Sequence, residues 1–356
     1  MAPEVSVLMS VYNGERYLKE SIESILNQTF SDFEFIIVDD GSQDSTAMIL
    51  RDYRDPRMVL LSNEVNIGLT RSLNRGLAVV RGTFIARQDA DDVSLPNRIE
   101  KQVAFLKAHP AIGILGSCCR LIDGEGRRLW LYRVPAYDLN IRWKSLLENP
   151  FAHPSVMMRR DILTENGLTY DETLQVAQDY DLWTRMMRYT QGTNLSEPLI
   201  HYRLSRGVTR TRREAQITNH DGIALRTIQY ELPGFAITLE QVSRLREFFA
   251  GGDTFLPRSR AEGVALTQAY LDMFETFMHR HAGEAGLETV RKEESLRATL
   301  LVLCTPLQRG WIRAMRRLLG MNPDLPWVLV RQVPNLCLRL VRKLLTITVY
   351  GRRNKP

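Results

Sequence analysis

The sequence predicts an α/β protein in which a parallel sheet, covered by helices on both faces, is followed by a mostly helical C-terminal region. In residues 1–120, short apolar runs alternate with stretches whose apolar residues recur at helical spacing, and strands that alternate with helices form parallel sheets. From about residue 220 onward, helical spacing dominates. We place a boundary near residue 215, which predicts a domain over 1–215 and a helical region over 216–356.

The expected strands are the apolar runs at 5–11, 33–38, 58–61, 83–86 and 112–118. Helices are expected at 17–26, 44–50, 69–80, 98–109, 139–147 and 179–189. Pro96 is expected at the first helical position before 98–109, where proline is tolerated. The alternation weakens after Trp130, and we predict no strand between there and the helical region.

The overall composition is that of an ordinary globular protein, with 44% hydrophobic and 25% charged residues. No apolar stretch approaches the ~20 residues that a membrane-spanning helix requires. The four cysteines lack metal-ligand spacing, so we expect reduced thiols. These features predict a cytoplasmic protein.

The basic residues are concentrated in the tail, because residues 301–356 carry eleven Lys and Arg against one acidic residue. Apolar residues recur among them at helical spacing, and such helices suit a surface of anionic lipid. We therefore expect peripheral association with the inner face of the cell membrane; packing of the apolar stripes on the protein body is the alternative. A nucleic-acid partner is not expected, since the tail lacks aromatic interleaving and a recognisable motif.

Three polar loops, at 10–13, 39–42 and 89–92, follow expected strands and should meet at one edge of the sheet. The third contains Asp89, Asp91 and Asp92. Carboxylate oxygens are the ligands that Mg²⁺ and Mn²⁺ prefer, with diphosphate oxygens completing the shell. This loop therefore predicts a metal site, unless it is a solvated loop in which Asp92 caps the next helix.

The second loop contains Asp39 and Asp40, followed by Gly41. A carboxylate at a strand end can accept hydrogen bonds from a base or from ribose hydroxyls, while a glycine lets the backbone approach a ligand closely. An ordinary strand-turn-helix corner is the alternative interpretation.

These segments, in this order and spacing, resemble the inverting glycosyltransferase family 2, of the type found in bacterial polysaccharide biosynthesis, whose catalytic domain has the GT-A fold. The matching segments are residues 10–14, 24–30, 38–42 with Asp44 and Thr46, 66–69 with Asn74 and Gly76, Gly82, 89–92, Pro96 with Arg98 and Gln102, 153–156 and 178–183. The resemblance covers roughly residues 4–205. It implies a Rossmann-like mixed sheet with helices on both faces.

The resemblance also implies roles for individual residues on the donor side. The nucleotide-binding residues that it implies are Ser10, Val11, Tyr12, Asp40, Asn66, Arg71 and Asp89. Within this set Asp40 is expected to face a uracil ring, whereas Asn66 and Arg71 line the diphosphate. Asp91 is implied as the direct ligand of Mn²⁺ or Mg²⁺.

On the acceptor side, the resemblance implies that Asp179 is the general base and that His153 and Gln178 line the acceptor or sugar pocket. For His153, a structural histidine with satisfied hydrogen bonds is the alternative. The family often has Glu where this chain has Gln178, which leaves the base intact but removes a neighbouring charge. For Asp179, an ordinary helix N-cap is the alternative.

The expected reaction is transfer of a single sugar, of the hexosyltransferase type, from a UDP-linked donor to a hydroxyl of a glycan or lipid-linked acceptor. A base must take the acceptor proton on one side while a metal neutralises the diphosphate on the other. Processive relatives carry a Gln-x-x-Arg-Trp segment after the base, which is absent here. The alternatives are a membrane-docked sugar-nucleotide-binding protein without turnover, which Gln178 favours, and a sugar-phosphate nucleotidyltransferase, which needs a Gly-rich basic loop that residues 12–16 do not supply.

Overall fold

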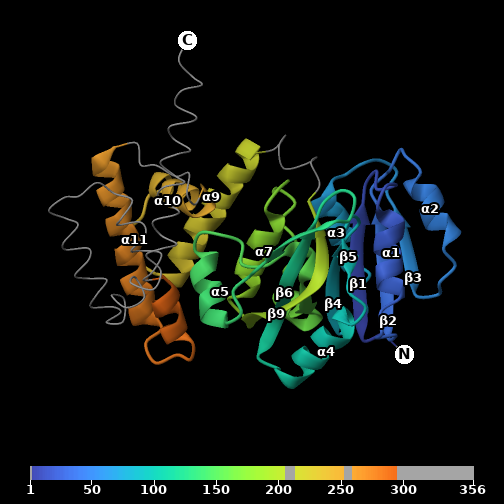
Figure 1. The fold of residues 1–356 in the computed structure, drawn as a ribbon, viewed down its shortest axis with the longest axis horizontal. Coiled ribbons are helices and arrows are strands. Elements are labelled where there is room, and N and C mark those ends of the chain that lie inside the picture. Colours follow the sequence, from blue (N-terminus) through green and yellow to red (C-terminus); the bar gives the residue numbers. More distant parts are fainter. Residues whose placement is uncertain (1, 205–212, 252–258, 295–356) are drawn as a thin grey trace, which may run out of the picture. The chain divides into compact units, whose positions relative to one another are not determined.

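A computed structural model describes residues 2–204, 213–251 and 259–294 (Figure 1). By its internal contacts the chain divides into two units, one formed by residues 1–145 with 149–223 and the other by 146–148 with 224 onward. Each unit is described by itself. The predicted boundary near residue 215 stays a prediction.

The first unit is built on one sheet. Its strands are β1 (Val5–Val11), β2 (Phe33–Asp39), β3 (Met58–Ser62), β4 (Phe84–Asp89), β5 (Val93–Ser94), β6 (Ile112–Ile122), β7 (Arg128–Tyr132), β8 (Met157–Arg159) and β9 (Gln191–Arg203). The spatial order is β3-β2-β1-β4-β8-β6-β9-β5, with β7 paired to β6. Its helices are α1 (Leu18–Leu26), α2 (Thr46–Asp52), α3 (Leu69–Leu77), α4 (Arg98–Ala108), α5 (Asp138–Ser145), the 3₁₀ helix η1 (His153–Ser155), α6 (Arg160–Glu165) and α7 (Gln178–Met186).

The predicted parallel half of the sheet is confirmed, because β1 pairs in parallel with β2 and β4, and β2 with β3. The other half is mixed. Strand β8 is antiparallel to both β4 and β6, whereas β9 runs parallel to β6. In register, Ser10 lies beside Val38 of β2 and Asp89 of β4, so the polar ends of three strands lie at one edge.

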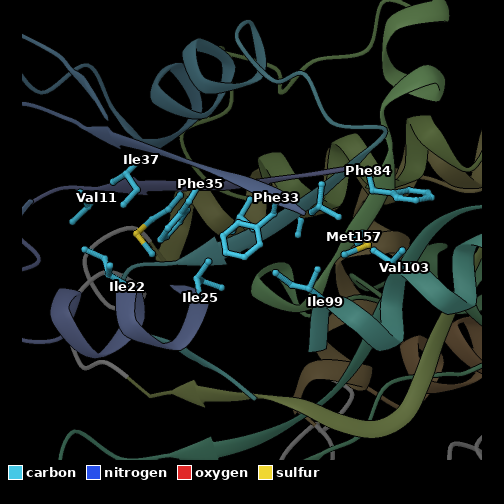
Figure 2. Packing of buried hydrophobic residues seen from close by; sticks show 14 of the residues in the cluster. Val11, Ile22, Ile25, Phe33, Phe35, Ile37, Phe84, Ile99, Val103 and Met157 are labelled. Carbon is cyan, nitrogen blue, oxygen red and sulfur yellow. The ribbon is translucent and has the colours of Figure 1, made fainter. Parts of the chain in front are cut away.

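Two apolar layers hold the helices on opposite faces of this sheet. One layer packs α1, α2 and α4 against β1 and β2, and Figure 2 shows Ile22, Ile25 and Ile99 of these helices against Phe33 and Phe35. The other layer joins α3, α5, α6 and α7 to alternate residues of the same strands. Helices therefore cover both faces, as predicted.

The sequence analysis missed β9, the longest strand of the sheet. Gly192, Asn194 and Pro198 are residues that strands disfavour. Pro198 lies where the pairing of β6 with β9 shifts its register, which accommodates a residue that cannot donate to the ladder. Pairing with a long apolar neighbour, rather than local propensity, makes this segment a strand.

The described part of the second unit is helical, as the sequence predicted. It contains the C-terminal part of α9 (Arg213–Glu231), followed by α10 (Leu239–Gly251) and α11 (Arg260–Arg280). The buried guanidinium of Arg244 pairs with Glu262 at 2.6 Å, which ties α10 to α11. Within the described ranges, no helix combines the length and the apolar character needed to cross a bilayer. The predicted amphipathic tail, residues 301–356, lies outside these ranges.

Candidate functional site

Asp40 follows β2 directly and holds the loop that comes after β3. Its carboxylate accepts hydrogen bonds from the backbone N–H groups of Ile67 (2.8 Å) and Gly68 (2.9 Å) and from the side chain of Asn63 (2.7 Å). The side chain is almost fully buried. The structure thus gives Asp40 a role in shaping loop 63–68, and its contact with a uracil ring stays a prediction.

Gly41 lies against the same loop. Its φ of +69° is in the left-handed region, which favours glycine. A Cβ at this position would lie 2.6 Å from the backbone carbon of Val65 and 2.8 Å from the nitrogen of Asn66. The residue therefore permits the close approach of two backbone segments.

We expect Gly41→Ala to lower the free energy of unfolding by about 2 kcal/mol or more, because neither backbone segment can move away without breaking the Asp40 hydrogen bonds. Gly167→Ala is the matched control, since Gly167 also has a positive φ but a Cβ there meets nothing within 4 Å. That variant should lose only about 1 kcal/mol. Urea unfolding measures both; equal losses would contradict the argument from close approach.

A cavity of about 270 Å³ opens at the N-terminus of α3. It is lined by Asn66, Ile67, Gly68, Leu69, Thr70, Arg71, Glu172, Leu174 and Gln175. The structure therefore brings together Asn66 and Arg71, the two residues predicted to line a diphosphate. Arg71 is exposed and lies 3.5 Å from Glu172. Backbone N–H groups at a helix N-terminus, with a mobile cation beside them, suit an anionic group.

Three further nucleotide-binding candidates lie at the end of β1. Ser10 and Val11 are buried, whereas Tyr12 is 45% exposed. Val11 pairs in register with Asp39, which leads into the Asp40 turn. The sheet thus places the first two polar loops side by side, as the sequence predicted.

Asp89 ends β4, and the fully buried Arg87 fixes its carboxylate. The Arg87 guanidinium donates to Oδ1 of Asp89, and its Nε donates to Nε2 of His153 at 3.1 Å. The Tyr170 hydroxyl lies 3.3 Å from the same Nε2. Because a guanidinium can only donate, Nε2 is the acceptor and the ring proton is on Nδ1, which lies 4.0 Å from Oδ2 of Asp89.

His153 packs among aromatic rings, with Tyr170 and Trp183 at centroid distances of 6.1 Å. Burial, and secondly the positive charge of Arg87, lower the pKa of His153 below its ordinary value of 6.5. The imidazole is therefore neutral in the folded protein near neutral pH.

This shift predicts a pH dependence of stability. The unfolded chain takes up a proton at His153 below pH 6.5 more readily than the folded protein does, so the contribution of His153 is complete above pH 6.5 and is lost as the pH falls below it. His153→Gln keeps an acceptor for Arg87 but cannot be protonated. We expect the decline in unfolding free energy between pH 6.5 and about 5 to be smaller in this variant. Equal declines in urea titrations of the two proteins would contradict the assignment.

Asp92 is fully buried, so the alternative of a solvated loop with a capping Asp92 is wrong. Helix α4 begins after Asn97 instead. The Oδ1 atom of Asp92 accepts the backbone N–H of Arg203 at 2.7 Å, and the Oδ2 atom of Asp92 has no hydrogen-bond partner among the described residues. Burial, followed by the charges of Asp91 and Asp89, raises the pKa of Asp92 well above its ordinary value.

Arg203, at the end of β9, braces the acidic loop and was not predicted as a site residue. Its Nε donates to the backbone carbonyl of Asp91 at 2.8 Å, and its guanidinium pairs with Glu20 of α1 at 2.6 Å. The same group lies over the ring of Tyr17, 4.2 Å from the centroid. The Arg203 side chain thus fixes the backbone of Asp91. Asp91 as a whole is only half-buried.

Asp179 is the second residue of α7, so the N-cap alternative is wrong. The N-cap position is Ala177, whose φ of +63° is unusual for a residue with a Cβ. The Asn149 side chain donates to Oδ2 of Asp179 at 2.7 Å. Gln178 is 95% buried, and its Oε1 has no partner in the described part of the chain. Its contact with an acceptor stays a prediction.

The electrostatic surroundings of Tyr202 in β9 include both the acidic loop 89–92 and Asp179. Burial, and then the negative charges of Asp92, Asp89, Asp179 and Asp91 in decreasing order, raise the pKa of its phenol. The charges of Asp89 and Asp179 also act on His153. Nδ1 of His153 lies 4.0 Å from Oδ2 of Asp89, and the His153 ring packs against Trp183 of α7, the helix that carries Asp179. The predicted metal loop and the predicted base, about 90 residues apart in the chain, therefore belong to one neighbourhood. The sequence analysis missed Tyr202, Arg87 and Asn149; only the position of Arg87 beside Asp89 was a signal.

Comparisons of the sequence with known proteins identify its family. The model of the family described as glycosyl transferase family 2 matches residues 6–167. An uncharacterized glycosyltransferase of Methanocaldococcus jannaschii is 40% identical over 208 residues, which are 57% of this chain and 71% of that protein. The chain belongs to glycosyl transferase family 2. The putative glycosyltransferase EpsE of Bacillus subtilis (39% identity; 56% of this chain, 73% of that one) and the O-antigen biosynthesis glycosyltransferase WbnJ of Escherichia coli (35%; 56% and 79%) are further relatives.

Solved structures identify the fold of this family 2 enzyme as GT-A, as predicted. Residues 1–349 of S. aureus TarS, in complex with UDP-GlcNAc, match with a TM-score of 0.57 and 19% identity, covering 91% of this chain and 92% of that chain. The mannosyltransferase PcManGT of Pyrobaculum calidifontis, in complex with GDP-Man and Mn²⁺, matches with a TM-score of 0.50 and 17% identity over 92% and 88% of the chains.

Proposed function

We propose that this glycosyltransferase is inverting and metal-dependent, and that it moves a single sugar from a UDP-linked donor to a hydroxyl of a glycan or lipid-linked acceptor. The observation that carries the proposal is the pair of distinct carboxylate groups in one neighbourhood. The loop 89–92 follows β4, and Asp179 stands in the first turn of α7. Both contribute to the electrostatic surroundings of Tyr202 and His153.

The residues of the acidic loop fit a divalent metal that is held mainly by substrate. No group of three or more His, Cys, Asp or Glu residues within the described ranges is arranged to hold an ion on its own. Mg²⁺ and Mn²⁺ at nucleotide sites are instead held by one or two carboxylates together with phosphate oxygens. Asp91 would be the direct ligand and Asp89 a contact of the ribose or sugar hydroxyls. Once bound, the metal would neutralise charge on the departing diphosphate.

Asp179 is the proposed general base. Removing the acceptor proton requires an ionised carboxylate that is not held by a cation, and the N-terminal end of α7 favours negative charge there. The hydrogen bond from Asn149 orients one oxygen and leaves the other available for an acceptor hydroxyl. His153, neutral and fixed by Arg87, would line the acceptor side without competing for the proton.

The donor would lie across the first two polar loops and the α3 cavity. Asp40 shapes the loop that carries Asn66, and Arg71 can exchange its contact with Glu172 for one with the diphosphate. The exposed Tyr12 would contribute to the nucleoside site. The preference for UDP is supported by the UDP-GlcNAc complex of TarS, whereas PcManGT shows that GDP-Man is used by another protein of the same fold.

Incubation of the purified full chain with a panel of nucleotide sugars tests the proposal. We expect slow hydrolysis of UDP-sugars, with release of UDP, that stops in EDTA and returns with Mn²⁺ or Mg²⁺. Release of pyrophosphate from a sugar phosphate and UTP would favour the nucleotidyltransferase. Binding without any turnover would favour the binding protein that Gln178 suggests.

We further propose that the protein associates with the inner face of the cell membrane through its basic C-terminal residues. Eleven Lys and Arg residues against one acid in 301–356 support this. The full chain should sediment with vesicles containing anionic lipid at low salt and be released at high salt, because the attraction is screened. Equal sedimentation with neutral vesicles would contradict the electrostatic part of this proposal.

A further inference from the structure

Strand β7 contains a bulge beside an exposed aromatic side chain. Between the pairs Arg120–Leu131 and Ile122–Arg128, the two residues Leu129 and Trp130 stand opposite the single residue Leu121. Trp130 is 60% exposed and Leu129 is 37% exposed. Bulges of this kind commonly redirect a side chain beside an active site. An exposed indole on a strand therefore needs an explanation in terms of what it binds.

The register places Trp130 on the same face of the sheet as Tyr202. Tyr132, Cys119 and Ile200 are neighbours across β7, β6 and β9, and they pack in one cluster with Ala152 and Tyr202. Side chains two positions along each strand return to the same face.

The next row along these strands is therefore Trp130, Leu121 and Tyr202, with Leu121 directly beside Tyr202 in the parallel pairing. Neighbouring strands lie about 4.8 Å apart, so the backbones of Trp130 and Tyr202 are about 10 Å apart. Strands β6 and β9 are seen side by side in Figure 1.

This row leads from the proposed reaction centre to the protein surface. The phenol of Tyr202 lies within the influence of both the acidic loop and Asp179, and Ala152 of the same cluster directly precedes His153. Trp130 therefore stands about two strand spacings, roughly 10 Å, from Tyr202, on the side that faces away from β9. On the same face, Leu204 continues the alternation of β9 and is 41% exposed, which extends the apolar surface.

We propose that Trp130 is the platform on which a sugar ring of the acceptor stacks, one or two residues away from the hydroxyl that reacts. This inference rests on the proposed function. The C–H groups on one face of a pyranose complement the electron-rich face of an indole. A tryptophan loses little conformational entropy when it binds, because it has only two side-chain torsions. The ligand assigned to Trp130 is therefore a pyranoside with an accessible apolar face.

Saturation-transfer NMR of the full chain, in the presence of UDP and the diamagnetic Mg²⁺, tests this with millimolar methyl pyranosides of the gluco, galacto and manno series. We expect transfer to the protons of one face of at least one glycoside. Trp130→Ala should weaken that binding about tenfold, and Trp130→Phe should retain part of it. Tyr189→Ala is the matched control, because Tyr189 is also an exposed aromatic (54%) but precedes the other end of β9.

UDP affinity, measured by calorimetry, reports whether Trp130→Ala is folded; Trp130→Phe serves in its place if it is not. Glycosides that bind to the variant as tightly as to the wild type would overturn the inference. So would a wild type that hydrolyses UDP-sugar yet binds none of the glycosides, or self-association of the wild type that Trp130→Ala abolishes without a change in glycoside binding. Absence of both UDP-sugar hydrolysis and UDP binding in the wild type would instead overturn the proposed function, and this inference with it.

Discussion

Replacing Asp179 by Asn is expected to reduce turnover by about 10² or more while UDP affinity stays near that of the wild type. The amide is nearly isosteric with the carboxylate and its oxygen can still accept from Asn149, so the local geometry should survive. It cannot accept a proton from the acceptor hydroxyl. Acceptor-dependent UDP release measures the rate, and calorimetry measures the affinity.

Asp161→Asn provides the matched control for this experiment. Asp161 is also an acidic residue in the first turn of a helix, α6. It is exposed, and its carboxylate accepts a hydrogen bond from the backbone N–H of Ile162. Its replacement should leave the rate unchanged. A parallel collapse of rate and UDP affinity in Asp179→Asn would show that Asp179 binds donor or supports the fold instead of acting as a base.

Replacing Asp91 by Ala should reduce turnover by at least about 10³-fold, since the variant lacks the carboxylate that would share the metal with the diphosphate. The part of UDP affinity that depends on Mn²⁺ should be lost, while the metal-independent part remains. Because Arg203 contacts the backbone carbonyl of Asp91, the loop should keep its course without this side chain.

Titration of UDP into wild type and variant, with and without Mn²⁺, separates these contributions. Asp32→Asn is a suitable control, as Asp32 is an exposed acidic residue that precedes β2 at the opposite edge of the sheet. Full activity of the wild type in EDTA, or an unchanged Mn²⁺ dependence in Asp91→Ala, would be incompatible with the proposed metal site.

The sequence predicted well those elements whose pattern is local. The strands from β1 to β4 and the helices between them have apolar spacing that matches their burial, and the polar loops follow because parallel strands end at one edge. The short β8 carries too few residues for a periodic pattern. The strand β9 contains Gly192 and Pro198, and its pairing with β6, over 70 residues earlier, decides its structure.

The residues of the candidate site also divide into those with a local sequence signal and those whose contacts depend on distant parts of the chain. Asp40, Asp89 and Asp179 could be proposed from motifs, whereas the side chains that contact Asp40 and Asp179 come from other parts of the chain. Asn149 lies 30 positions from Asp179, and nothing in the local sequence around either residue pairs them. The burial of Asp92 could not be predicted for the same reason, because its partner Arg203 stands at the end of β9.

The contacts between Arg203 and the acidic loop affect how the protein folds while it is being synthesised. Arg203 lies 111 positions after Asp92 and 183 after Glu20, and contacts between such distant residues form slowly. While the ribosome is still making the segment before β9, the edge of β6 that β9 will occupy has no partner. Such an edge can pair with other nascent chains. We therefore expect competence to bind a metal-nucleotide complex to arise only after residue 203 has left the ribosome, as a late event in folding.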